Sequence, residues 1–425
     1  MVKLISYIGS KVKLYDFLNE NIFNNDSFKN KKYNFFDLFA GTNSVSHYVK
    51  NNTDWNVYGN DLSLYSHKLF SFLYFDRLNK TQLKIIKDKL EILSNMDLIS
   101  TGIFFNEFSY NGSVTTIDKD KFSDVFGNQP IESRMFFSEI VGKRIDTIRS
   151  QIIQWQKSGE IKDNIITDIL LTFLIHYVDK NSNTASVYGA YLKNTKKMTM
   201  ETPFLSQDLL KLLSVNTSDN TQVINSTNLP VSDSLEEYKI NNTNKKDNII
   251  YLDPPYSTRS YESNYHILEY ISDFNFDISY IKHNSKTAQR NVKNTNPFAS
   301  KAKTFPIFEE MITKSLELGN NVFISYSTDG LMQQSDIDMI FSDLKKVHSN
   351  LILNIYTKSY KRFKSANTEL KKLQEKLNNL SNMKNKTDDI LNEITVINQE
   401  LREYVKPEAE ENELQEILWH FQIKE

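Results

Sequence analysis

The stretch NFFDLFAGTNSVSHYVKNNTDWNVYGND, residues 34–61, decides how the rest of the sequence is interpreted. It opens with a short apolar run around Asp37, passes through the glycine-containing turn AGTNSVS into the helical segment HYVKNN, and closes on a second β-rich run that ends at Asp61. An alternation of strand, turn, helix and strand is typical of a parallel α/β sheet. We therefore predict that these residues begin such a sheet.

Further along the chain, four more apolar runs have the composition of strands. Helical segments such as TFPIFEEMITKSLELG lie between them, which indicates that the later runs continue the same sheet. We expect strands at NIIYLD (248–253), NVFISYS (321–327), LILNIYTKSY (351–360) and EILWHFQI (416–423).

The region between the two blocks of strands has a different character. It contains amphipathic helical segments such as RIDTIRSQIIQWQKSG and NIITDILLTFLIHYVDK. We therefore predict a mainly helical domain inserted over residues 78–245. The sheet domain then comprises residues 1–77, 246–365 and 413–425.

Leucines and isoleucines recur at spacings of three and four residues in two stretches near the end of the sequence. The polar segment SNMKNKTDD separates the two stretches, so two helices folded back on each other would bury both apolar stripes. We predict an antiparallel coiled-coil hairpin insert over residues 366–412 and interpret it as a structural or partner-docking arm. Its stripes are Leu370, Leu373, Leu377 and Leu380, then Ile390, Ile394, Ile397 and Leu401.

The composition excludes several classes of protein. The 425 residues, 12% of them aromatic, are enough for the core of two or three domains. No run approaches the roughly 18–20 apolar residues that cross a bilayer, so we expect a cytoplasmic protein with no membrane partner. Cysteine is absent, which excludes disulfides, thiolate metal sites and a cysteine nucleophile, and we predict no metal centre.

The net charge of −2 means that a polyanionic partner would have to meet a local basic face. Residues 278–307 contain no acidic residue and form one candidate for such a face; the alternative is a solvated loop of a lysine-rich protein. Its cations are Lys282, Lys286, Arg290, Lys293, Lys301 and Lys303.

The first strand-to-helix turn has the features of a nucleotide-like cofactor site. Asp37 lies at the end of the strand, and Gly41 lies where the backbone bends toward the helix. Asp61, at the end of the next strand, is placed to accept hydrogen bonds from ribose hydroxyls. Small residues also follow strands for packing reasons, and Asp61 could instead cap the helix LSLYSHKLF.

A second candidate site follows the strand NIIYLD, at Asp253-Pro254-Pro255-Tyr256. The two prolines fix the backbone and donate no hydrogen bond, so the Asp253 carboxylate and the Pro254 carbonyl become two acceptors at a fixed separation. With Tyr256 as a planar wall, they fit a planar amine such as the exocyclic amino group of a nucleobase. Acceptors that take up the developing positive charge would make that nitrogen a better nucleophile. The alternative is a turn that only ends the strand.

Taken in order, these motifs resemble the alpha-class, Dam-like adenine-N6 DNA methyltransferases, and among them the FokI-type restriction-modification methylases. The resemblance covers nearly the whole chain except the coiled-coil insert. The segments that carry it are YIGSK (7–11), DLFAGT (37–42), YGND (58–61), LDPPYSTRSYESNYH (252–266), FISYS (323–327) and YKRFK (360–364).

The resemblance implies a Rossmann-like sheet of seven strands with a reversed last hairpin, S-adenosylmethionine as cofactor and double-stranded DNA as partner. Residues 78–245 would be the target-recognition domain. Tyr7 and Lys11 would line the methionine end of the cofactor, and Asp61 would bind its ribose. The remaining cofactor pocket would be shaped by Asp37, Phe39, Ala40, Gly41, Thr42 and Asp253.

The resemblance makes Asp253, Pro254, Pro255 and Tyr256 the catalytic motif, which holds and stacks an adenine flipped out of the duplex. We expect DNA contacts from the basic residues within 278–307 and from the segment after the catalytic motif. These residues are Lys282, Lys286, Arg290, Lys293, Arg259 and Tyr265.

One position departs from the family pattern, because Asn43 stands where the first cofactor motif usually has a glycine. Asparagine tolerates the left-handed conformation, so we expect the turn to be preserved.

Other functions were weighed against adenine-N6 methylation. Cytosine-C5 methylation needs a cysteine nucleophile and is excluded. Cytosine-N4 methylation, and a non-catalytic DNA-binding or assembly subunit that retains the fold, stay open. The sequence does not decide between a restriction partner and a stand-alone methylase.

Overall fold

In the computed structural model the chain forms two compact units. The larger one comprises Met1–Tyr326, Gly330–Tyr356 and Leu418–Glu425, and the smaller one Ser327–Asp329 and Thr357–Ile417. The structure describes all residues except 1–3, 8, 29–30, 119–123, 127–128, 194, 214–220, 257–260, 292–297, 299, 361–375, 378–379, 381–387, 404–413 and 425.

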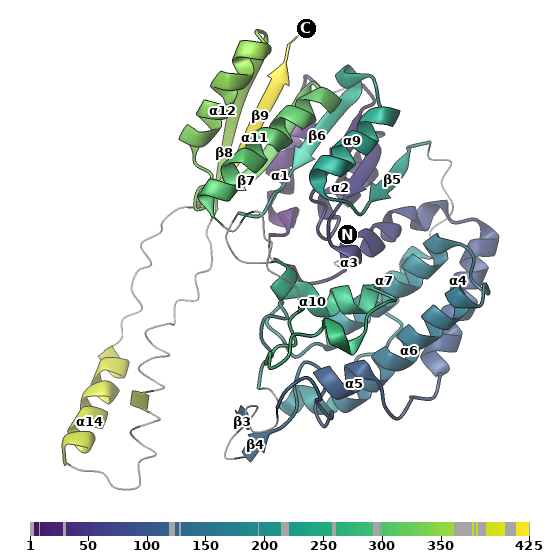
Figure 1. The fold of residues 1–425 in the computed structure, drawn as a ribbon, viewed down its shortest axis with the longest axis vertical. Coiled ribbons are helices and arrows are strands. Elements are labelled where there is room, and N and C mark those ends of the chain that lie inside the picture. The colour runs from purple at the N-terminus through teal and green to yellow at the C-terminus, as the bar shows by residue number, and fades with distance from the viewer. Residues whose placement is uncertain are drawn as a thin grey trace. The chain divides into compact units, whose positions relative to one another are not determined.

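A seven-stranded sheet is the centre of the larger unit, with strand order β5-β2-β1-β6-β7-β9-β8 (Figure 1). The pairs from β5 through β7 are parallel. The strands are β1 (Asn34–Asp37), β2 (Asn56–Asn60), β5 (Ile224–Thr227), β6 (Asn248–Leu252), β7 (Asn321–Ser327), β8 (Leu351–Tyr360) and β9 (Leu414–Ile423).

The last strand, β9, runs against its neighbours. Its end bonds to the start of β7 through Ile423 N to Asn320 O at 3.0 Å, and to the start of β8 through Lys424 N to Asn350 O at 3.2 Å. Both contacts are those of antiparallel pairs. The predicted strands and the reversed last hairpin are therefore confirmed.

Helices cover the sheet and form a second layer beside it. Here α2 packs on β1 and β2, while α9 packs on α11, which contacts β6. The α-helices are α1 (Tyr15–Leu18), α2 (Ser44–Asn52), α3 (Leu64–Leu69), α4 (Lys80–Asn95), α5 (Ile103–Phe108), α6 (Glu139–Lys157), α7 (Asn164–Asn181), α8 (Gln207–Leu212), α9 (Val231–Asn241), α10 (Tyr261–Ser272), α11 (Lys301–Leu318), α12 (Gln334–Val347) and α14 (Asp388–Glu403). Shorter elements are η1 (Lys11–Leu14), η2 (Asn19–Phe23), η3 (Phe70–Arg77), η5 (Thr195–Thr199), η6 (Lys245–Asp247), η7 (Ile278–Tyr280), and the hairpin strands β3 (Asp124–Phe126) and β4 (Gln129–Ile131).

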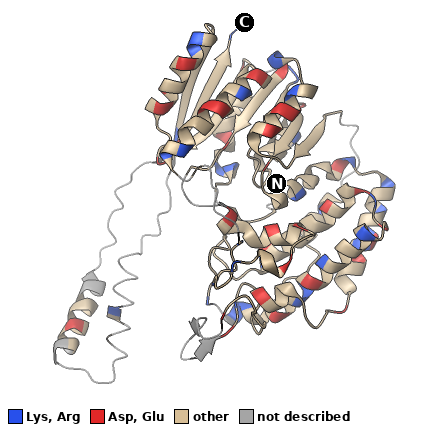
Figure 2. Ribbon diagram, in the orientation of Figure 1, with Lys and Arg blue, Asp and Glu red and all other residues tan. Residues whose placement is uncertain are grey.

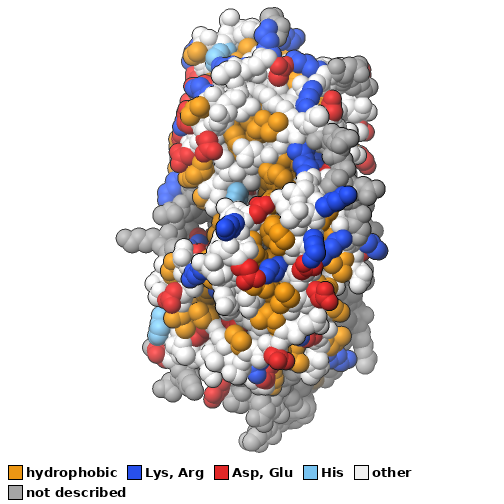
Figure 3. Space-filling model, turned by 90° about the vertical axis from the view of Figure 1, so that its right-hand side faces the viewer, with side chains coloured by type: hydrophobic (Ala, Val, Ile, Leu, Met, Phe, Trp, Pro, Cys, Tyr) orange, Lys and Arg blue, Asp and Glu red, His pale blue; other side chains and the backbone are white. Residues whose placement is uncertain are grey.

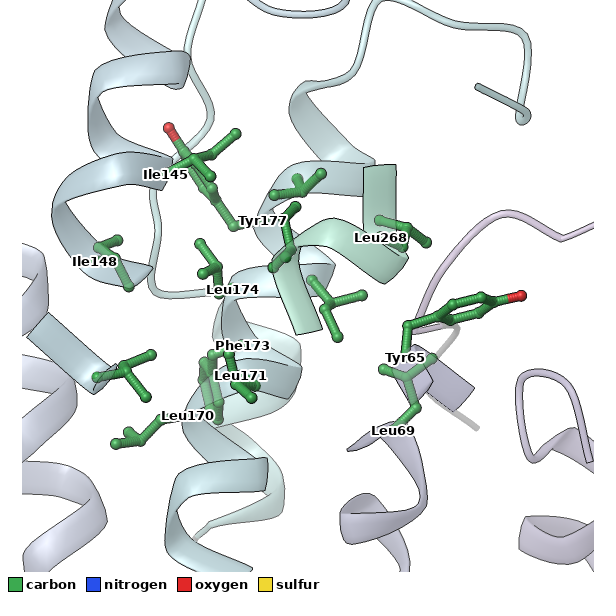
Figure 4. Close-up of a cluster of buried hydrophobic side chains, with 14 of the residues drawn as sticks. Tyr65, Leu69, Ile145, Ile148, Leu170, Leu171, Phe173, Leu174, Tyr177 and Leu268 are labelled. Atoms are coloured by element: carbon green, nitrogen blue, oxygen red, sulfur yellow. The ribbon is translucent and has the colours of Figure 1, made fainter. Parts of the chain in front are cut away.

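The helical layer is organised around α7. This helix is buried on nearly every side, as expected of a helix that is apolar all round. Side chains from α3, α6, α7 and α10 meet in one hydrophobic cluster (Figure 4). The middle of the sequence is therefore mainly helical, and it belongs to the same compact unit as the sheet.

The predicted domain boundaries stay a prediction. Strand β5 lies at the edge of the main sheet, so the sheet includes residues from Ile224 onward that precede residue 246. Helix α10, predicted as part of the sheet domain, packs in the helical cluster instead. The predicted boundary after residue 77 coincides with the end of η3 at Arg77.

The coiled-coil hairpin falls largely outside the described residues. Helix α14 is present in the second stripe, and Ile397 is buried there. A short helical piece of the first stripe contains Lys376, whose Nζ lies 2.7 Å from Glu393 Oε1 of α14. The antiparallel coiled coil itself stays a prediction.

Charges of both signs are spread over the surface. Lysines and arginines alternate with acidic residues along α4, α6, α11 and α12 (Figure 2). On the side seen in Figure 3, hydrophobic side chains form several separate groups among polar ones. Among the described helices, none has the length and apolar character that crossing a membrane requires.

The packing of α5 against α6 predicts the effect of enlarging Gly142. An ideal Cβ at this position would lie 2.0 Å from Ser109 Oγ and 2.9 Å from Phe105 Cα. Helix propensity alone favours alanine by about 1 kcal/mol, but overpacking costs about 1–3 kcal/mol. Gly142→Ala should therefore lower the free energy of unfolding in denaturant titrations. Ser150→Ala, at an exposed position of the same helix, is the control; equal stabilities of the two variants would contradict this packing.

Candidate active site

The turn after β1 contains two residues in the left-handed conformation. Gly41 has φ 53° and Asn43 has φ 59°. A Cβ on Gly41 would lie 3.1 Å from the ring of Tyr7, so glycine suits both the backbone angle and the close approach. Asn43 donates from Nδ2 to Ser66 O at 2.9 Å, which ties the turn to α3. The expectation that asparagine preserves the turn is confirmed.

Asp61 holds this turn from the end of the neighbouring strand. Its Oδ2 accepts from Gly41 N at 2.8 Å, and its Oδ1 accepts from Ser63 N at 2.8 Å. The alternative that Asp61 caps the following helix is wrong. Helix α3 begins at Leu64, and its first N–H groups donate to Glu269 of α10 instead.

A cavity with about 270 Å³ of empty space opens beside this turn. Eight of the nine residues predicted to bind the cofactor line it, and Asp61 lies behind it through its bond to Gly41. The eight are Tyr7, Lys11, Asp37, Phe39, Ala40, Gly41, Thr42 and Asp253.

Five further residues line the same cavity without having been predicted: Gly9, Ser10, Ser44, Val45 and Tyr251. Gly9 and Ser10 stand between Tyr7 and Lys11 in YIGSK, so the motif itself could have indicated them. The other three line the cavity because α2 and β6 pack around the turn. No short sequence motif indicates this packing.

Asp37 is buried at the floor of the cavity. Its Oδ2 accepts from Ser46 Oγ at 2.7 Å and from Ser46 N at 3.2 Å. Burial raises the pKa of Asp37 to about 7, and the nearby carboxylates of Asp253 and Asp61 contribute in the same direction. A cationic ligand in the cavity would favour the ionised form, so the site is suited to positive charge.

Asp253, Lys11 and Tyr256 form a hydrogen-bonded cluster at the end of β6. Asp253 Oδ1 lies 2.8 Å from Lys11 Nζ and accepts from the Tyr256 hydroxyl at 2.9 Å. Lys11 also donates to that hydroxyl and lies 4.6 Å from the centre of the Tyr256 ring. Oδ1 of Asp253 therefore already accepts from a nitrogen, that of Lys11, which lies next to the Tyr256 ring.

Aromatic rings from the neighbouring strands support the Tyr256 ring, beginning with an edge-to-face contact. Its centre lies 4.8 Å from that of Tyr326 on β7, which in turn stacks on Trp419 of β9 at 5.5 Å. The Tyr256 carbonyl accepts from Leu331 N at 3.1 Å. These contacts fix the ring in place, as a stacking surface requires.

The predicted DNA contact of Tyr265 stays a prediction. In the structure its ring is 1% exposed and stacks on Tyr7, which lines the cavity, at 4.7 Å. Tyr65 of α3 also packs on Tyr265, and the centres of the two rings are 5.8 Å apart. The physical reason is that α10 packs in the helical cluster, which directs Tyr265 inward.

Three of the other residues predicted to contact DNA, Lys282, Lys286 and Arg290, lie in one loop, residues 281–290, which we call the basic loop. Lys282 and Lys286 are exposed there. Arg290 is half-buried, and its Nη1 lies 3.6 Å from Glu262 Oε1. Arg259 and Lys293 lie outside the described residues.

The raised pKa of Asp37 predicts how stability depends on pH. The pKa is about 7 in the native state against an ordinary value of 3.8. Between these values the native state holds a proton that the unfolded chain releases, so the free energy of unfolding falls as pH rises. This contribution is at most about 4 kcal/mol.

Asp37→Asn cannot ionise and should flatten the decline between about pH 4 and 7 in denaturant titrations at a series of pH values. If the two proteins gave parallel curves across this window, the buried proton on Asp37 would be ruled out.

Comparisons with known proteins show the family to which the chain belongs. The family model of D12 class N6 adenine-specific DNA methyltransferases matches residues 7–316. The chain is 30% identical to the type II methyltransferase M.NlaIII of Neisseria lactamica, over 86% of this chain and 94% of that protein. It is 28% identical to M.CviAII of Paramecium bursaria Chlorella virus 1 (85% and 93%), and 29% identical to M.FokI of Planomicrobium okeanokoites (84% and 50%). The chain therefore belongs to the D12 class N6 adenine-specific DNA methyltransferases.

Proposed function

We propose that this adenine-specific methyltransferase uses S-adenosylmethionine, held by the turn after β1, to methylate N6 of an adenine flipped out of double-stranded DNA. The observation that carries the proposal is the cluster of Asp253, Lys11 and Tyr256 at the edge of the cavity. Family membership favours adenine over the exocyclic nitrogen of cytosine and over a non-catalytic role.

The residues of the cavity fit this cofactor. Gly41 leaves room where a Cβ would press on Tyr7, and Asp37 supplies a buried carboxyl that a positive charge would ionise. Tyr7 and Asp37 would face the methionine part, and Asp61 the ribose. When bound, the cofactor supplies an electrophilic methyl group on a positively charged sulfur.

Asp253 and Tyr256 would act on the target base. The Asp253 carboxylate, with the Pro254 carbonyl, accepts hydrogen bonds from the exocyclic amino group, and Tyr256 stacks on the ring. These acceptors favour a nitrogen with a localised lone pair and stabilise the positive charge that develops on it. The Lys11 ammonium occupies this acceptor position in the structure, so it must move aside when the base enters.

DNA would be held by the basic loop and read by the mainly helical middle region. Lys282 and Lys286 are exposed on the loop, where they would contact phosphates. The three related proteins named above are type II methyltransferases. We propose that this chain modifies DNA in the cytoplasm, either alongside a restriction endonuclease or as a stand-alone methylase. A partner on the coiled-coil arm stays a prediction.

The role of Asp253 is tested by Asp253→Asn. An amide oxygen is a weaker acceptor and carries no charge, so kcat for methyl transfer to duplex DNA should fall by about 100-fold or more. Because Asp253 also lines the cavity, the affinity for S-adenosylmethionine is measured separately by calorimetry and should fall far less than kcat. The control is Asp247→Asn, just before β6, which changes a surface ion pair with Lys31 and a hydrogen bond from Asn244. If both variants retained kcat, Asp253 would not hold the reacting nitrogen.

The DNA-binding role of the basic loop is tested by replacing Lys282 and Lys286 with alanine together. The slope of log K against log salt concentration should become shallower by about 2, because each phosphate contact contributes about 0.9. Lys80 and Lys87, exposed on α4, provide the matched double alanine control. Equal slopes in the two double variants would place the DNA elsewhere.

A further inference from the structure

Buried side chains hold the backbone of the basic loop through hydrogen bonds to its carbonyl groups. Four consecutive carbonyls, those of residues 285–288, each accept a hydrogen bond from such a donor. Arg134 donates to Ser285 O at 2.7 Å and to Lys286 O at 3.1 Å. With its carbonyls directed inward, the loop presents Lys282 and Lys286 to solvent.

Two side chains of α10 hold the other two carbonyls. His266 Nε2 lies 2.6 Å from Thr287 O, and the Tyr270 hydroxyl donates to Ala288 O at 3.0 Å. Burial lowers the pKa of His266 to about 4, which favours a neutral ring with one N–H group. Its Nδ1 lies 3.1 Å from Ser263 O, so two carbonyls compete for that hydrogen, and the shorter contact to Thr287 O favours Nε2 as the donor.

Arg134 is the centre of this arrangement because all five of its N–H groups are used. Besides the two loop carbonyls, it donates to Glu107 O and Glu107 Oε2 at 2.8 Å each, and to Thr116 Oγ1 at 3.0 Å. Both Arg134 and Glu107 are completely buried. Burial alone would raise the pKa of Glu107, but hydrogen bonds from Thr116 and Thr115, and the charge of Arg134, hold it below its ordinary value.

A buried ion pair is a poor way to gain stability, because removing two charges from water costs about as much as their attraction returns. Its geometric effect is larger. The flat, five-donor guanidinium fixes acceptors from α5, from the turn at Thr116 and from the basic loop in one plane. A lysine or an apolar side chain could not satisfy these acceptors together.

We propose that Arg134, paired with Glu107, is a positioning residue for DNA binding: it fixes the backbone of the basic loop so that Lys282 and Lys286 meet the phosphates of the duplex. This inference rests on the proposed function, since it assumes that the loop contacts DNA. It assigns to a buried ion pair a role in substrate affinity and not in chemistry.

The test compares Arg134→Lys with Arg149→Lys in the full-length chain. Arg149 is the matched control, because it is also buried and donates to backbone carbonyls, at Ile271 and Asp273, but does not touch the basic loop. Each protein is measured for thermal stability, S-adenosylmethionine affinity, and KM and kcat on a DNA duplex.

Arg134→Lys should raise KM for DNA by about 10-fold, because two phosphate contacts lose their fixed geometry. Its kcat at saturating DNA and its cofactor affinity should stay within about twofold of wild type. Arg149→Lys should lose stability without the rise in KM. Equal KM shifts in the two variants, or none in Arg134→Lys, would overturn the inference.

A milder variant covers the case in which Arg134→Lys does not fold. Tyr270→Phe removes only the hydroxyl that donates to Ala288 O and keeps the ring, which stacks on Phe276 at 4.3 Å. It should raise KM for DNA by about threefold and speed tryptic cleavage after Lys286. An unchanged KM and cleavage rate would count against a loop held by these bonds.

The outcomes separate the inference from the proposed function. If wild type methylates adenine and loss of Lys282 and Lys286 weakens DNA binding, while Arg134→Lys and Tyr270→Phe do not, only the positioning role fails. If loss of the two lysines has no effect, the loop is not a DNA surface and the inference fails with it. If wild type methylates no adenine, the proposed function fails.

Discussion

The parallel register of β1 between β2 and β6 is the constraint on which the rest of the structure depends. Asp37 pairs with Gly59 on one side and with Tyr251 on the other. Three strands therefore end at one edge of the sheet, and the residues after them converge there. This brings Asp61 to the turn at Gly41, and Asp253 to the cavity lined by Asp37. Under the proposed function, this single edge would serve both the cofactor and the target base.

Convergence of three carboxyl groups at one edge has an electrostatic consequence. Burial opposes the ionisation of Asp37, and the nearby carboxyl groups of Asp253 and Asp61 add to this effect. Lys11 offsets part of this charge through its contact with Asp253. An acidic site of this kind would suit the sulfonium of the proposed cofactor and an amino group that becomes positive as it reacts.

Much of the site was predictable because its signals are local. A strand that ends in a carboxylate, a glycine turn and an Asp-Pro-Pro-Tyr sequence are each contained in a few residues, and the fold places them as expected. What was not predictable depended on distant contacts. The inward direction of Tyr265 follows from the packing of α10, and the cap of α3 comes from Glu269, 205 residues away. Strand β5 is four residues long with polar side chains, too short for its pattern to be distinguished from a loop.

The central claim is that Asp253 and Tyr256 direct methyl transfer to the amino group of adenine. Its most direct test is mass spectrometry of nucleosides from the DNA of a host that expresses the protein, beside a host that expresses Asp253→Asn. The account predicts N6-methyladenine with the wild-type protein and its loss with the variant. N4-methylcytosine in place of N6-methyladenine, or equal N6-methyladenine from both proteins, would contradict it.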